Sequence, residues 1–303
     1  MAALLEVKNV ALHELIADDA IAEQIAGGFA FTEGPVWQRD ALLFSDIRNN
    51  RIVRWRQLRE GPEVTTFGLG QSNGLTLDRD GVLLAAEHGG RRVSRIASDG
   101  ARATLVDRHR GKRLNSPNDI VVKSDGSIYF TDPPYAVTAN LNRVPGWWST
   151  MLPGKQLSVN GVYRLTPDGL LTLLADDFNL PNGLAFSPDE TVLYVDDSER
   201  QHIRAFDVQE SGTLANSRVV LDMAAAEPGV PDGMKVDAAG NIFCTGPGGI
   251  WVCRATGELL GRIILPEIPA NLAWGDEDWS TLFVTARTSV YRIRTKTQGC
   301  PVP

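Results

Sequence analysis

The sequence lacks the features that would place the protein in a membrane or on a nucleic acid. The N-terminus, residues 1–24, has no basic segment followed by a continuous apolar run, so we predict no signal peptide. No stretch is long and apolar enough to span a bilayer. With a net charge of -7 and a pI near 5.2, the chain offers no basic surface for phosphates. We therefore expect a cytoplasmic protein that binds neither nucleic acid nor membrane.

Cysteine is scarce, and so are the sequence signs of nucleophilic or zinc catalysis. Only Cys244, Cys253 and Cys300 occur, at spacings that form no disulfide framework, which indicates a reducing compartment. A Gly-x-Ser-x-Gly string occurs once, at Gly70–Gly74, but it opens a strand repeat rather than the strand-to-helix turn of serine hydrolases, and the four histidines have no metal-binding spacing. The sequence therefore predicts neither a Ser-His-Asp hydrolase nor a histidine-bound zinc site.

Helical periodicity is almost absent, whereas short strand-like segments recur along the whole chain. Six segments share one plan: a polar residue, a short apolar strand, a turn with Asp or Gly, and a second apolar strand. The polar residues that open these segments, called the anchors below, are Glu33, Asn73, Asn118, Asn182, Asp232 and Asn271. A third strand follows in every repeat and a fourth in five of them, which is the strand count of a propeller blade.

The sixth repeat has no fourth strand because the chain ends soon after its third strand at 289–293. Residues 21–31 precede the first repeat and can supply the missing strand, which would close the ring and remove an open edge. The sequence thus predicts an all-β, six-bladed β-propeller with four-stranded blades, closed by an N-terminal strand. We expect one domain over 1–303, with 1–20 as an N-terminal extension.

The anchors should form a ring at one mouth of the central channel, because the innermost strand of each blade lines it. All six side chains carry oxygen, and Glu33 and Asp232 are anionic. Carboxylate and amide oxygens without sulfur are the ligands that a hard cation such as calcium prefers. The alternative is that Asn-Gly and Asp-Gly only form tight turns. That alternative fails for Glu33 and stays open for Asn73 and Asn271.

Polar residues also end the second strands, which return to the same mouth. Asp132 and His88 lie there; they fit ligand or substrate contact, or simply a supporting and a surface role. Tyr135 fits substrate contact or packing. The third repeat is longer than the others, 64 residues between anchors against 39 to 50, and the excess falls in 136–160. We interpret 136–160 as an inserted loop over the site.

Five motifs, in order along the chain, resemble one family: FTEGPVW, RLNSPNDIVV, IYFTDPPY, LPNGLAFSPDETVLYV and VPDGMKVDAAGNIF. This is the gluconolactonase / senescence marker protein (regucalcin) family, and the resemblance covers nearly the whole chain from Glu33 onward. Paraoxonases and diisopropyl fluorophosphatase are more distant relatives with the same six-bladed plan. The resemblance implies a calcium-dependent hydrolase of sugar lactones.

The family pattern, carried over residue by residue, supplies a ligand set for the metal. The ligands would be Glu33, Asn118, Asn182 and Asp232. Asn118 would bind the metal directly or through water and substrate. Calcium is the expected cation, and magnesium, manganese and zinc are alternatives. Asp232 is the first candidate for the general base; Asp119 and Asp132 are alternatives, and both also fit supporting roles.

The remaining candidates would contact the substrate. They are Asn73, His88, Arg113, Asn115, Asp132 and Tyr135. The family places its arginine two positions before the Asn-Asp pair, where this chain has Ser116, so Arg113 departs from the pattern. Two other functions stay open: an organophosphate or arylester hydrolase on the same metal, and a propeller that binds metabolites or proteins without catalysis. A small sugar lactone is the expected partner, and both a monomer and a homodimer fit.

Overall fold

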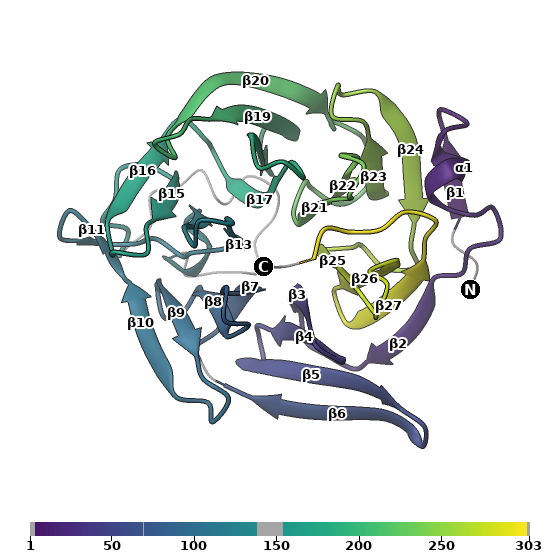
Figure 1. The fold of residues 1–303 in the computed structure, drawn as a ribbon, viewed down its shortest axis with the longest axis horizontal. Helices are drawn as coiled ribbons and strands as arrows, with labels where there is room; N and C mark the ends of the chain where they lie inside the picture. Colours follow the sequence, from purple (N-terminus) through teal and green to yellow (C-terminus); the bar gives the residue numbers. More distant parts are fainter. Residues whose placement is uncertain (1–3, 69, 138–153, 302–303) are drawn as a thin grey trace.

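The computed structural model describes residues 4–68, 70–137 and 154–301 and shows a ring of six four-stranded blades (Figure 1). The predicted six-bladed β-propeller is confirmed. The innermost strands are β3 (Thr32–Gln38), β7 (Ser72–Leu77), β13 (Ile120–Val122), β17 (Pro181–Phe186), β21 (Met234–Val236) and β25 (Asn271–Gly275). The second strands are β4 (Ala41–Asp46), β8 (Leu83–Glu87), β14 (Ile128–Asp132), β18 (Val192–Asp197), β22 (Ile242–Gly246) and β26 (Thr281–Ala286).

The outer half of each blade also follows the repeat. The third strands are β5 (Arg51–Leu58), β9 (Arg92–Ile96), β15 (Gly161–Leu165), β19 (His202–Val208), β23 (Gly249–Cys253) and β27 (Ser289–Arg294). The fourth strands of blades one to five are β6 (Gly61–Phe67), β10 (Arg102–Val106), β16 (Leu171–Ala175), β20 (Leu214–Asp222) and β24 (Leu259–Ile264). The short hairpin of β11 (Arg108–His109) and β12 (Lys112–Arg113) connects blades two and three, and the 3-10 turn η1 (Tyr135–Val137) follows β14 within blade three.

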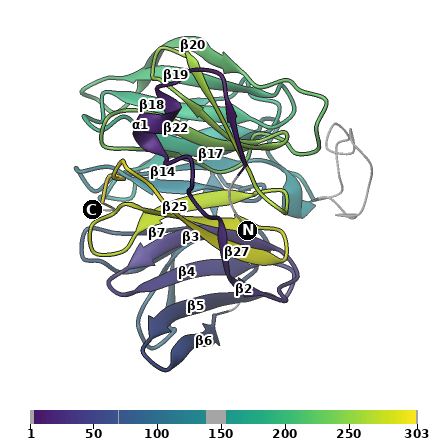
Figure 2. The same cartoon turned by 90° about the vertical axis from the view of Figure 1, so that its right-hand side faces the viewer.

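The N-terminal segment closes the ring, as predicted. Strand β2 (Glu23–Gly27) pairs antiparallel with β27 and completes the sixth blade. The predicted extension adds strand β1 (Leu4–Val7) to the outer edge of β24 and carries helix α1 (Leu12–Leu15). Figures 1 and 2 show this segment, in purple, running along the outside of the ring. Leu12 and Leu15 are buried against blades five and six, so the apolar face of α1 holds the segment in place.

Burial falls from the channel outward, and the sequence of each strand matches its position. Strands β4 and β7 are buried at every residue, which requires an apolar or hydrogen-bonded side chain on both faces. The outer strand β10 has exposed or half-buried residues throughout and carries polar side chains that discourage edge pairing. Blades join through apolar contacts such as Trp37 stacked on Phe283 at 5.1 Å. Among the described residues no helix has the length and apolar character needed to cross a bilayer.

Candidate active site

All six anchors stand at the mouth end of their innermost strands, and hydrogen bonds link neighbouring side chains among five of them. Asn73 Nδ2 donates to Asn118 Oδ1 at 2.7 Å, and Asn118 Nδ2 donates to Asn182 Oδ1 at 2.8 Å. The structure therefore brings together residues that are up to 238 positions apart in the sequence, as the hydrogen bond from Asn271 to Glu33 shows.

The two anionic anchors lie close enough to affect each other. Burial raises the pKa of Glu33 to about 7, and the nearby Asp119 charge adds to the rise. Burial also raises the pKa of Asp232 well above its usual range, with the charge of Glu33 as the next cause. Asn271 Nδ2 donates to Glu33 Oε2 at 3.1 Å, which stabilises one carboxylate but leaves the repulsion between the two. A cation between them would relieve this repulsion.

The donor set fits a hard divalent cation. The four predicted ligands offer two carboxylates and two amide oxygens, with no sulfur or imidazole among them. Asp119 Oδ2 and Asn73 Oδ1, both buried near these ligands, have no hydrogen-bond partner within the described part of the chain. The described residues contain no group of three or more His, Cys, Asp and Glu side chains placed to hold a metal. A site here therefore depends on the amide oxygens of Asn118 and Asn182 as well as on carboxylates.

Glycine follows four of the anchors because the next blade approaches too closely for a side chain. A Cβ on Gly183 would overlap the carbonyl oxygen of Asp232, and a Cβ on Gly34 would overlap that of Asn73. Gly183 does not have a positive φ, so the close approach of the next blade, and not the backbone conformation, requires glycine there. The repeated Asn-Gly and Asp-Gly pairs are thus packing devices that set one anchor against the next.

We predict that Gly183→Ala destabilises the protein by about 3 kcal/mol, because the new methyl group must displace the Asp232 backbone. Urea unfolding followed by circular dichroism measures this. Gly100→Ala is the matched control: Gly100 also needs a glycine conformation, with φ of 84°, but has open space around it. It should cost about 1 kcal/mol. Equal losses for the two variants would contradict the packing explanation.

Asp132 supports the connection that precedes an anchor and does not face the channel. Its two carboxylate oxygens accept the backbone N–H groups of Asn115 at 2.8 Å and Ser116 at 2.7 Å. Asp197 does the same for the backbone N–H of Asn179 at 2.8 Å, in the next blade. These bonds fix the chain two or three residues before an anchor. These contacts fit the supporting role that the sequence also allowed for Asp132, and its roles as substrate contact or base stay predictions.

We predict that Asp132→Asn lowers the free energy of unfolding by about 1–3 kcal/mol, because an amide nitrogen would then face backbone donors. Asp197→Asn should cost a similar amount for the same reason, and both are measured by urea unfolding. Hydrolysis of a sugar lactone by folded Asp132→Asn should stay within about threefold of wild type. A loss of activity without a loss of stability would instead indicate that Asp132 contacts the substrate.

His88 and Tyr135 do reach the ring of anchors. His88 Nε2 lies 3.0 Å from Asn73 Nδ2, and its ring centre is 5.8 Å from that of Tyr135. The Tyr135 hydroxyl accepts a hydrogen bond from Asn182 Nδ2 at 3.3 Å. Burial lowers the pKa of His88 to about 3, so the imidazole is neutral at physiological pH. These two aromatic side chains lie beside each other next to the anchors Asn73 and Asn182.

Arg113 and Asn115 touch neighbouring loops rather than the anchors. Arg113 Nη2 donates to the carbonyl of Gly90 at 2.9 Å, two residues beyond His88. Asn115 is fully buried, and its amide donates to the carbonyls of Asp132 and Val159. Arg113 therefore stands at the rim of the site, whereas Asn115 serves the same supporting network as Asp132. Residues 138–153 of the predicted loop 136–160 lie outside the part of the chain that the structure describes.

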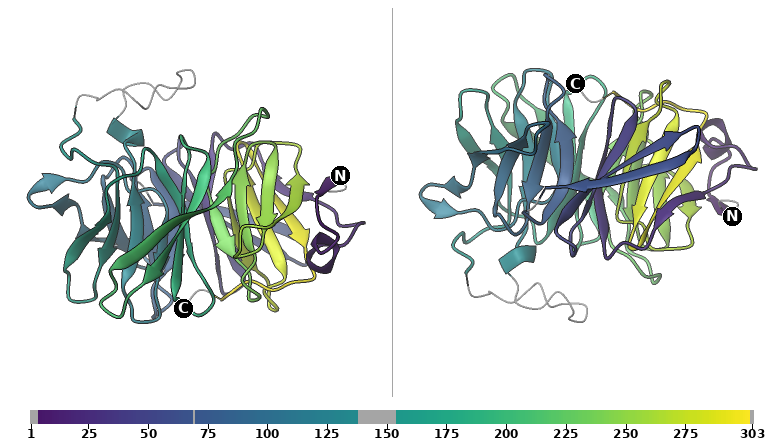
Figure 3. Two further views of the ribbon diagram at one scale, coloured as in Figure 1. Left: turned by 90° about the horizontal axis from the view of Figure 1, so that it is seen from above. Right: turned by 90° about the horizontal axis from the view of Figure 1, so that it is seen from below.

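A cavity of about 640 Å³ opens at the mouth and includes Asp232. Asp232 is partly exposed, whereas the other five anchors are buried. Figure 3 shows that η1 and the C-terminus lie on opposite sides of the ring. Of the three candidate bases, Asp119 and Asp132 are buried and only Asp232 meets the cavity.

Two site residues were not identified from the sequence. Ser198 Oγ accepts a hydrogen bond from Asn182 Nδ2 at 3.0 Å and donates to the Pro231 carbonyl at 2.6 Å, so it joins two ligand-bearing segments. Asp196 lies beneath Gly183, and one of its oxygens has no hydrogen-bond partner within 4–68, 70–137 and 154–301. The only sequence signal for both was the polar run at the end of one second strand.

Comparison with known proteins shows the family of the chain. A family model described as "SMP-30/Gluconolactonase/LRE-like region" matches residues 31–288. The chain belongs to this family. The family's match begins two residues before Glu33 and ends beyond Asn271, so it contains all six anchors.

Individual members of the family are similar over most of their length. The gluconolactonase of Zymomonas mobilis is 38% identical over 301 residues, covering 91% of this chain and 82% of that protein. The pentonolactonase XacC of Haloferax volcanii is 29% identical over 261 residues, covering 84% and 80%. The solved structure of a gluconolactonase from Xanthomonas campestris superposes with a TM-score of 0.84 at 34% identity, covering 96% of this chain and 94% of that one.

Proposed function

We propose that the protein opens sugar lactones by adding water to the lactone carbonyl, using a divalent cation held by the ring of anchors. The observation that carries this proposal is the position of Asp232, a carboxylate with a raised pKa that is the one anchor exposed to the mouth cavity. Relatives named gluconolactonase and pentonolactonase support the substrate class.

Four residues of this chain would hold the cation. They are Glu33, Asn118, Asn182 and Asp232. Because calcium takes six to eight oxygens, four protein ligands would leave room for water and a substrate oxygen. When bound, a divalent cation polarises a carbonyl oxygen as a Lewis acid. We expect calcium first, and magnesium, manganese or zinc remain alternatives.

Asp232 would accept the proton of the attacking water on a carboxylate oxygen. A base must lie within reach of the water that it activates, and only Asp232 among the three candidates meets the mouth cavity. The buried negative charges around it favour the protonated product, since they raise its pKa. A bound cation would lower the pKa of Asp232, so its basicity depends on the surrounding negative charges and on the cation together.

The side chains of His88, Tyr135 and Arg113 would position the sugar. A sugar lactone presents several hydroxyl groups, which need hydrogen-bond donors and acceptors. Neutral His88 and the Tyr135 hydroxyl supply both kinds at the rim of the ring. Arg113, which the β11–β12 hairpin places beside the Gly90 turn, is a further candidate contact.

A substrate panel tests the proposal. Purified protein with calcium should hydrolyse gluconolactone and pentonolactones, with kcat/KM for paraoxon and phenyl acetate lower by about 100-fold or more. Spontaneous lactone opening is subtracted with a protein-free control. Slow lactone hydrolysis together with rapid turnover of paraoxon or phenyl acetate would instead assign an organophosphate or arylester hydrolase. No turnover of any of these compounds would favour a binding protein.

A further inference from the structure

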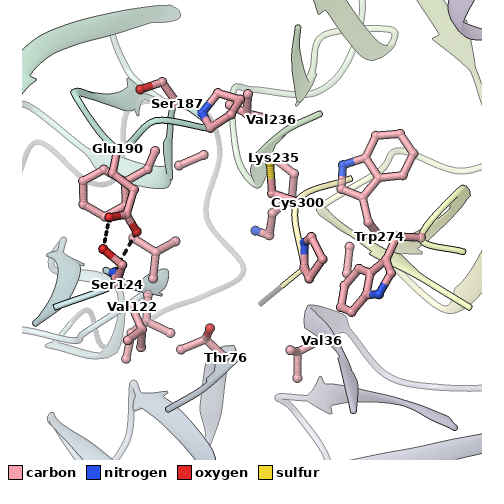
Figure 4. Close-up of a pocket in the computed structure, with 18 of the residues that line it drawn as sticks. Val36, Thr76, Val122, Ser124, Ser187, Glu190, Lys235, Val236, Trp274 and Cys300 are labelled. Carbon is pink, nitrogen blue, oxygen red and sulfur yellow. Dashed lines mark hydrogen bonds between the residues drawn. The ribbon is translucent and has the colours of Figure 1, made fainter. Parts of the chain in front are cut away.

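A second cavity lies in the channel on the far side of the anchors, and one repeat position supplies a wall of it from every blade. This cavity, of about 410 Å³, is called the lower cavity below. The residues three positions after each anchor line it, and they are Val36, Thr76, Val121, Ala185, Lys235 and Trp274. Five of them are uncharged. The lysine in the fifth blade is therefore an exception to the repeat, and Figure 4 shows it in this cavity.

Lys235 reaches toward a carboxylate beside the metal ligands. Its Nζ lies 4.0 Å from Asp119 Oδ2 and donates to the Met234 carbonyl at 2.9 Å. The side chain of Asp119 is only 3% exposed, and its Oδ2 has no hydrogen-bond partner among the described residues. The Lys235 ammonium is thus the counter-charge of this buried oxygen. Removing either partner would leave an uncompensated charge.

Other acidic groups at the lower cavity are already paired, so they do not compete for Lys235. Glu190 bonds Lys123 at 3.1 Å and the Ser124 backbone at 2.7 Å (Figure 4 shows the Ser124 contact). Asp189 accepts hydrogen bonds from Ser187 and Thr191 within its own turn. The positive charge of Lys235 consequently acts toward the anchors, on Asp119 and on Glu33.

The formal charges of the inner strands show what this lysine changes. From each anchor to the end of its strand, the six segments carry three carboxylates, Glu33, Asp119 and Asp232, and one ammonium, Lys235. The formal charges of these segments total -2, equal and opposite to the charge of one divalent cation. Without Lys235 the same segments would carry -3, a charge that favours cation binding but strains the metal-free protein.

We propose that Lys235 and Asp119 form a built-in charge pair beneath the ring that sets the affinity of the site for its divalent cation. The pair does not ligate the cation in this account; it fixes the charge that the ligands present. This inference rests on the proposed function, because it assumes that the anchors bind a cation. It predicts opposite effects for the two members of the pair.

Calorimetric titration of chelated protein with Ca²⁺ tests the pair. Lys235→Met should tighten Ca²⁺ binding by about tenfold or more, and Asp119→Asn should weaken it by a similar factor. The double variant Lys235→Met/Asp119→Asn restores the net charge, so its Kd should return to within about threefold of wild type. Lys235→Arg keeps the charge and should change the Kd by less than about threefold.

The titration separates failure of this inference from failure of the proposed site. If wild type binds Ca²⁺ but Lys235→Met and Asp119→Asn bind it equally well, the charge pair has no role and the site stands. If Glu33→Gln, which removes a ligand, also leaves Ca²⁺ binding intact, the anchors are not the site and the inference falls with it. Should Lys235→Met fail to fold, Asp119→Asn and the double variant still decide the question, because the double variant leaves no unpaired charge and Asp119→Asn leaves only the ammonium of Lys235, whose side chain is partly exposed to solvent.

Discussion

Replacing Asp232 with Asn should lower kcat/KM for gluconolactone hydrolysis by about 10³-fold or more. The change removes the proposed proton acceptor, a contribution of about 10²–10⁴-fold, and one of the two anionic ligands. The amide of Asn keeps the size of the side chain, so the variant tests the charge of Asp232 rather than its packing. A pH-indicator assay of acid release, corrected for spontaneous opening, measures the rate.

Asp237→Asn is the matched control for this variant. Asp237 is a fully buried carboxylate in the same blade, five residues further on, where it accepts hydrogen bonds from the Asn241 backbone and the Thr297 hydroxyl. Its loss should reduce stability but leave kcat/KM of the folded protein within about threefold of wild type. If Asp232→Asn kept more than a tenth of the activity, Asp232 would be neither base nor essential ligand.

Chelation should abolish most of the lactonase activity, by about 100-fold or more, and should lower the melting temperature of the protein. The loss of stability follows from linkage: a cation present at 100 times its Kd stabilises the folded state by about 2.7 kcal/mol. The repulsion between Glu33 and Asp232 in the metal-free ring acts in the same direction.

Adding calcium in excess of the chelator should restore both activity and melting temperature. Parallel titrations with magnesium, manganese and zinc rank the alternatives. Full activity in the presence of excess chelator, with metal analysis confirming that the protein is stripped, would rule out metal-dependent catalysis. Recovery of stability without activity would leave the cation a structural role only.

The fold could be predicted because the same pattern of polar residue and apolar strand recurs along the chain. One Asn-Gly pair is an ordinary turn, but Asn73, Asn182 and Asp232 each followed by glycine and an apolar strand identify a blade. Ring closure followed from counting strands, since the last blade lacked one and residues 21–31 were unassigned. The pairing of β2 with β27 confirms this count.

The supporting contacts could not be predicted, because they depend on distances between blades. Asp132 and Asp232 look alike in the sequence: each is an acid near the mouth in a motif with proline. Only the structure shows that Asp132 bonds the backbone of Asn115 and Ser116 while Asp232 opens to the cavity. Lys235 was overlooked for a related reason: one lysine in an apolar strand has meaning only when its neighbour Asp119 is known.

A crystal structure with calcium tests the central claim most directly, because the claim is that the anchors form one metal centre. Anomalous scattering should locate one ion coordinated by Glu33, Asn118, Asn182 and Asp232, and that ion should be absent from crystals of Glu33→Gln. An ion bound elsewhere in the propeller, or no ion at calcium concentrations that support full activity, would contradict the account.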